Sequence, residues 1–120
     1  MGSATTFKDL HVWQTSMDLA REVYRVTRDL PRTEVFGLTS QIRRAAVSVP
    51  SNIAEGNGRQ HPKEYVQCLS IAMGSLREVE TLWILCQELL PHAERSRMDE
   101  LLDQTGRMLN RLRATIRAKI

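Results

Sequence analysis

No stretch of this 120-residue sequence approaches the roughly 20 consecutive apolar residues that a membrane-spanning helix needs. The first ten residues, MGSATTFKDL, also lack the basic start and apolar run of a secretion signal. These two absences favour a cytoplasmic protein with no membrane segment. With 42% hydrophobic and 26% charged residues, the chain can bury a core, and its length suits one domain over residues 1–120.

Cysteine is scarce, since Cys68 and Cys86 are the only two. On one continuous helix they would stand roughly 27 Å apart, which is far beyond the reach of a disulfide. Neither belongs to a CxxC pair of the kind found in redox and zinc sites. We therefore expect both to be small buried hydrophobic residues.

Sequence motifs typical of catalytic or metal-binding sites are missing as well. The sequence has no Glu-x-x-His pair, no GxSxG and no Cys-His arrangement, and its three histidines share no motif. The segment GNGR lacks the strand and the third glycine of a nucleotide-binding loop. We expect no catalytic residue, no metal and no cofactor, and hence no enzyme.

The dominant pattern in the sequence is the helical periodicity of its apolar residues. Apolar residues recur at steps of three and four through four segments, at about 9–30, 38–55, 62–90 and 96–118. The longest of these lines runs without a slip through Tyr65, Leu69, Ala72, Leu76, Val79, Trp83, Cys86 and Leu90. Four amphipathic helices on short connections predict an all-α, up-and-down four-helix bundle.

Local signals predict where these helices begin and end. Pro62 suits the first turn of the third helix, and Ser96 and Asp99 have the spacing of a capping box for the fourth. The two glycines of GNGR would supply the left-handed backbone angles that close the second.

The second helix contains Pro50, yet its apolar period continues unbroken to Ile53 and Gly56. This predicts a kink and not a stop, at a cost of about 3 kcal/mol because Pro50 cannot donate to the carbonyl of Ala46. Ser48, Ser51 and Asn52 could satisfy the backbone groups that the interruption frees. The bend could serve packing alone, or it could shape a binding surface.

The first and third helices each carry two adjacent apolar lines. On the third, the second line holds Cys68, Ile71, Ser75, Leu82, Leu85 and Leu89. A face this wide serves either the core alone or the core together with a subunit contact.

Positive charge is concentrated at the end of the fourth helix. The last 14 residues hold five basic side chains and no acidic one, whereas the rest of the chain carries 12 basic and 14 acidic residues. Arg107, Arg111, Arg113 and Arg117 would lie opposite the apolar side of the helix. Arginine suits bidentate phosphate contacts, so these four are candidate nucleic-acid contacts.

Arg43 and Arg44 are further candidates, because no acidic residue lies three or four positions from either. They need a partner on another helix, on another subunit or in a phosphate group. By contrast, the arginine line from Arg21 to Arg32 is flanked by Asp18, Glu22 and Asp29 and predicts a self-paired, solvated surface.

Three segments, FKDLHVWQTSMDLA, GLTSQIRRAAVSVPSNIAEG and LSIAMGSLREVET, resemble the bacterial four-helix bundle family of proteins encoded in intervening sequences of large-subunit ribosomal RNA genes. The resemblance covers about residues 7–90 and weakens after the third helix, where ELLPHAE replaces the usual Gly-Tyr ending. The residues that match the family motif are Trp13, Gln14, Gln41, Arg43, Arg44, Pro50, Asn52, Glu55, Gly56, Gly74, Ser75 and Glu80.

The resemblance implies a ring-forming homo-oligomer, typically of five bundles. Relatives within this family include the accessory variability protein of diversity-generating retroelements, which binds nucleic acid and a reverse transcriptase. Two hypotheses follow. The first is a homo-oligomer that binds RNA or DNA through the basic fourth helix. The second is a protein-binding scaffold in which Pro50, Asn52, Glu55 and Gly56 build subunit contacts and Arg43 and Arg44 pair with Glu55 or Glu80.

Overall fold

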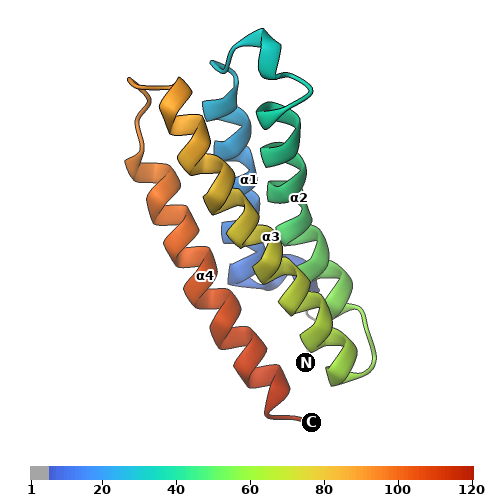
Figure 1. The fold of residues 1–120 in the computed structure, drawn as a ribbon. Helices are drawn as coiled ribbons and strands as arrows, with labels where there is room; N and C mark the ends of the chain where they lie inside the picture. The colour runs from blue at the N-terminus through green and yellow to red at the C-terminus, as the bar shows by residue number, and fades with distance from the viewer. Residues whose placement is uncertain (1–5) are drawn as a thin grey trace.

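Four long helices make up most of residues 6–120, the part of the chain that the computed structural model describes (Figure 1). They are α1 (His11–Thr27), α2 (Leu38–Asn57), α3 (Pro62–Leu89) and α4 (Ser96–Arg117), joined by short connections. α1 packs against α2 and α4, and α3 packs against the same two helices. The predicted all-α four-helix bundle is confirmed, with dimensions of 48 × 23 × 19 Å.

The helix ends differ from the predictions where capping groups have other partners. Residues Phe7–Asp9 form a separate 3₁₀ turn capped by Thr6, so α1 begins at His11 and not at residue 9. Pro62 occupies the first turn of α3 as predicted. No glycine in residues 6–120 has a positive φ angle, and Gly58 closes α2 at φ −82°, so the left-handed ending predicted from GNGR is wrong.

The capping box predicted at the start of α4 is also wrong. The residue that precedes the helix is Arg95, and its side chain forms no capping hydrogen bond. Asp99 instead accepts a hydrogen bond from the indole N–H of Trp83 on α3, at 3.2 Å. The backbone N–H of Ser96 donates to the Glu94 carboxylate at 2.7 Å.

α2 continues through Pro50 without a break, as the apolar period predicts. The hydroxyl of Ser51 donates to the carbonyl of Val47 at 2.8 Å, and the amide of Asn52 donates to the carbonyl of Ser48 at 2.9 Å. The Ser48 hydroxyl accepts from the same Asn52 amide at 3.0 Å and also hydrogen-bonds the Ser75 hydroxyl on α3, at 2.8 Å. Side chains near the proline therefore supply hydrogen bonds within the helix and across to its neighbour.

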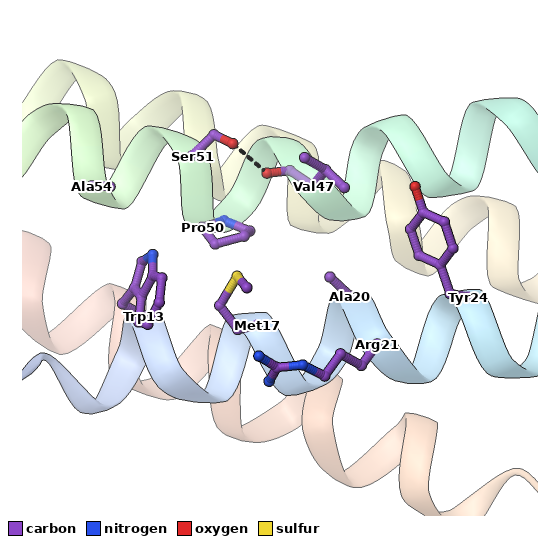
Figure 2. Close-up of a pocket in the computed structure, with 9 residues that line it drawn as sticks. All are labelled: Trp13, Met17, Ala20, Arg21, Tyr24, Val47, Pro50, Ser51 and Ala54. Atoms are coloured by element: carbon purple, nitrogen blue, oxygen red, sulfur yellow. Dashed lines mark hydrogen bonds between the residues drawn. The ribbon is translucent and has the colours of Figure 1, made fainter. Parts of the chain in front are cut away.

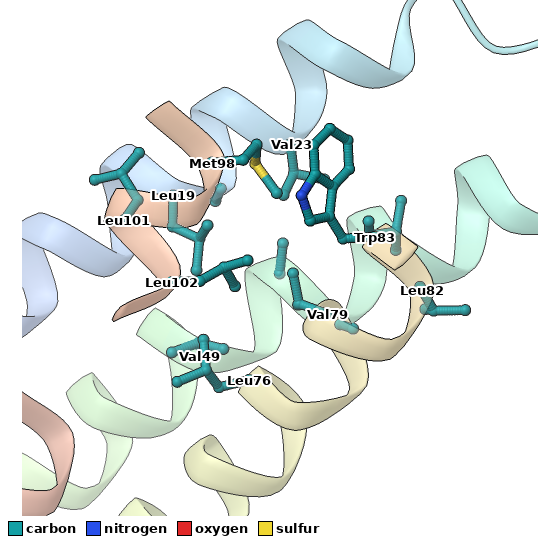
Figure 3. Close-up of a cluster of buried hydrophobic side chains, with 14 of the residues drawn as sticks. Leu19, Val23, Val49, Leu76, Val79, Leu82, Trp83, Met98, Leu101 and Leu102 are labelled. Atoms are coloured by element: carbon teal, nitrogen blue, oxygen red, sulfur yellow. The ribbon is translucent and has the colours of Figure 1, made fainter. Parts of the chain in front are cut away.

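The core is a continuous column of aliphatic side chains between the four helices. Figure 3 shows its central part, with Trp83 of α3 beside Val23 of α1 and Met98 of α4. Cys68 and Cys86 are both buried and unpaired, as expected. Burial also raises the pKa of the Cys86 thiol, because the thiolate would lose its hydration.

One polar atom in this column lacks a partner. Thr105 is fully buried on α4, and its hydroxyl forms no hydrogen bond within residues 6–120. Burying an unpaired hydroxyl is costly, so we expect Thr105→Val to raise the free energy of unfolding by roughly 1 kcal/mol, measured by urea denaturation. Thr115→Val on the exposed side of α4 is the matched control, and an equal gain there would contradict this explanation.

Candidate functional site

The four arginines predicted as one cationic face of α4 lie in three different environments. Arg107 is exposed but forms an ion pair with Asp103, one turn away, at 3.0 Å. Arg113 is half-buried against α3 and donates to the Ser70 hydroxyl at 3.4 Å and to the Asn110 side chain at 3.0 Å. Neither of these partners carries a negative charge that would offset the charge of Arg113.

The remaining cations on the last turns of α4 and just after it are free. Arg111, Arg117 and Lys119 are exposed, and none forms an ion pair with a carboxylate of residues 6–120. Lys119 also borders a cavity of about 290 Å³ with His61 and Lys63, where the first turn of α3 meets the last residues of α4. We call the set Lys63, Arg111, Arg113, Arg117 and Lys119 the basic end of the bundle.

Arg43 and Arg44 do not belong to this set. They lie on α2, diagonally across the bundle from α4. The Arg43 guanidinium covers the ring of Tyr24 at 4.5 Å and donates to the Thr27 hydroxyl at 2.9 Å. Arg44 is exposed beside a polar hollow that Glu78 of α3 also borders.

The predicted pairing of Arg43 and Arg44 with Glu55 or Glu80 is wrong within the chain. Each of those carboxylates already holds an arginine on its own helix or just beyond it. Glu55 binds Arg59 at 2.7 Å, and Glu80 binds Arg77. Local pairs at three or four residues form at a lower entropic cost than pairs between helices.

Gly56 has a clear structural role in the motif that includes Pro50, Asn52 and Glu55. A Cβ atom at this position would stand 2.8 Å from Cys68 Cβ and 2.8 Å from the Tyr65 ring. Only glycine therefore lets α2 approach α3 so closely here. Gly56 therefore shapes the contact between α2 and α3.

The family of 23S rRNA-intervening sequence proteins matches residues 8–111. The chain belongs to this family. No curated protein matches it, and the relation to the retroelement accessory protein stays a prediction.

This intervening-sequence protein also carries an apolar groove that the sequence did not predict (Figure 2). The groove lies between α1 and α2, has a volume of about 540 Å³, and is lined by Trp13, Met17, Ala20, Arg21, Tyr24, Val47, Pro50, Ser51 and Ala54. The helical period left open whether the two apolar lines of α1 serve the core alone or also a subunit contact, and Tyr24, which lies on one of these lines, is 45% exposed. The small side chains that α2 presents here, such as Pro50 and Ala54, leave the line uncovered.

A second apolar surface runs along the outer side of α3. Ile71, Leu85 and Leu89 are exposed there, at spacings that keep them on one side of the helix. Gly74 and Glu78 lie on the same side and are also exposed. We call these five residues the α3 strip.

Within residues 6–120, His, Cys, Asp and Glu side chains form no group of three or more that could hold a metal ion. No helix in this part of the chain is both long enough and apolar enough to cross a bilayer.

Proposed function

We propose that this intervening-sequence protein is a non-enzymatic, self-associating bundle that binds RNA through its basic end. The observation that supports this proposal is the group of free cations on the last turns of α4. Arg111, Arg117 and Lys119 have no carboxylate partner in the described chain, so phosphate groups would not have to displace one.

The geometry of the basic end fits a phosphate backbone better than a single small anion. Its cations come from the last three turns of α4 and the first turn of α3, so they are spread over an exposed surface. Arginine can bind phosphate oxygens in pairs. Five copies in a ring would gather about 25 such charges, and binding through many weak contacts at once would strengthen accordingly.

The test is the salt dependence of binding to a structured RNA. We expect the triple variant Arg111→Ala, Arg117→Ala, Lys119→Ala to bind about 10- to 100-fold more weakly near 0.15 M salt. The slope of log affinity against log salt should fall by about 2, because each lost phosphate contact lowers it by 0.7 to 0.9.

A matched control removes the same charge at the opposite end of the bundle. Arg28, Arg32 and Arg95 are exposed and form no ion pair within residues 6–120. Replacing these three with alanine should leave most of the slope unchanged. If both triple variants lose slope equally, net charge and not the basic end governs binding.

A protein-binding scaffold is the second candidate, and the apolar groove between α1 and α2 favours it. Grooves of this kind take the apolar side of an amphipathic helix. An assembled protein that binds neither RNA nor duplex DNA at low salt would favour this candidate over the first.

A further inference from the structure

A hollow lies between the start of α1 and the last turns of α4. It has a volume of about 270 Å³ and is lined by Leu10, His11, Val12, Met108, Arg111 and Leu112. We call it the α1–α4 hollow. Arg111 also belongs to the basic end, so the hollow borders the cations to which we assign RNA binding.

The floor of the α1–α4 hollow is apolar. Val12 is buried, and Leu10, Met108 and Leu112 are half-buried against the core. Covering such a floor with an apolar or aromatic group is favourable, because it removes apolar surface from water. A phosphate or another charged group would lose hydration there without gaining a partner from the floor.

Two planar side chains border this floor. His11 is the first residue of α1, and Arg111 stands on the same side of α4 as Met108 and Leu112, at steps of three and four. Both are exposed, and neither forms an ion pair within residues 6–120. Aromatic rings, including that of histidine, and arginine guanidinium planes are the groups on which proteins stack unpaired RNA bases.

The size of the hollow suits one flat ring system. Its volume of about 270 Å³ lies just below the range of roughly 300–1,000 Å³ that is typical of pockets for larger organic ligands. In a continuous duplex, every base is stacked between its neighbours and shows no free face. A base in a bulge, in a loop or at an end can instead turn out and stack on a protein.

We infer that the α1–α4 hollow holds one unstacked base of an RNA whose phosphates lie on the basic end. This inference rests on the RNA binding in the proposed function and names the class of RNA: strands with a bulge, a loop or a free end, in preference to continuous duplex. Arg111 joins the two sites, and Arg117 follows about 9 Å further along the axis of α4. Because the floor is apolar, the hollow accepts any of the four bases.

The test compares two RNA hairpins that differ in one base. One carries a single bulged adenosine in its stem, and the other carries an abasic ribose at the same place. Both have the same number of phosphates, so the electrostatic part of binding is the same for the two. We expect the wild-type protein to bind the bulged adenosine hairpin about 5- to 100-fold more tightly, with equal slopes of log affinity against log salt.

Substitutions at His11 show whether its ring holds the base. His11→Ala should bind the two hairpins with nearly equal affinity, whereas His11→Phe keeps a flat ring and should retain the preference for adenosine. His92→Ala is the matched control, because His92 is also exposed but lies in the connection between α3 and α4, at the opposite end of the bundle. This control should keep the full preference, and circular dichroism checks that all three variants are folded.

A photochemical cross-link locates the base directly. The bulged adenosine is replaced with 4-thiouridine, which the apolar floor should also accept, and the complex is irradiated with long-wavelength ultraviolet light. Mass spectrometry should then find the nucleotide on peptides that contain His11 or Met108, from the two sides of the hollow. Cross-links found only on peptides outside the hollow would overturn the inference.

The possible failures of this inference and of the proposed function give different results. If the wild type binds both hairpins equally, or if His11→Ala keeps the full preference for adenosine, the base site is wrong. The salt slope and its loss in the basic-end variant would still support RNA binding in either case. A wild-type protein that binds neither hairpin at low salt would overturn the base site and the proposed function together.

Discussion

Replacing Trp83 with alanine is expected to lower the free energy of unfolding by about 3–5 kcal/mol. The side chain is 2% exposed and packs in the centre of the core beside Val23 and Met98, so its removal leaves a large cavity (Figure 3). The substitution also removes the indole N–H that donates a hydrogen bond to Asp99 at 3.2 Å. Urea denaturation followed by far-ultraviolet circular dichroism measures the loss.

Trp83→Phe separates packing from hydrogen bonding. Phenylalanine fills most of the space but cannot donate to Asp99, so the loss should be about 1–2 kcal/mol. A Trp83→Ala loss below 1 kcal/mol would contradict a central packing role. Both variants are best compared at equal protein concentration, because the proposed self-association would add to apparent stability.

Gly56→Ala is expected to destabilise the bundle by roughly 1–3 kcal/mol, a large effect for one methyl group. The new Cβ would stand 2.8 Å from Cys68 Cβ, which is fixed to the backbone of α3, and 2.8 Å from the Tyr65 ring. One of the two helices must then shift. Thermal and urea unfolding both report the change.

Gly74→Ala is the matched control for this prediction. It places the same methyl group on a helical glycine of the neighbouring helix, where nothing lies within 4 Å. Without a clash, the gain in helix propensity should leave the monomer unchanged or stabilise it by up to about 1 kcal/mol. Equal losses at both positions would mean that backbone freedom, and not the approach of α2 to α3, explains Gly56.

The sequence predicted the four helices because helix packing imposes a period of 3.6 residues on buried side chains. Helix ends were less predictable, since a side chain with the spacing of a cap can form its hydrogen bond with another helix instead. Asp99 has the right spacing to cap α4, yet it binds Trp83 on α3. That choice depends on how two helices dock, which local spacing does not encode.

For the candidate site as well, the sequence predicted which residues are present but not which partners they bind. Charge counting located the basic residues of α4, but it could not show that Asp103 pairs with Arg107 or that Arg113 lies against Ser70. The groove was missed for a similar reason. Whether the line of Trp13, Met17 and Tyr24 is covered depends on the size of the side chains that α2 places opposite it.

The burial of both cysteines makes the chain well suited to site-specific labelling. Maleimide reagents attack the thiolate, and burial restricts access to Cys68 and Cys86 and raises the pKa of the Cys86 thiol. A fluorophore could therefore be attached to a cysteine introduced on the surface without removing the native pair. Energy transfer between dyes on separate copies would then test whether bundles associate in solution.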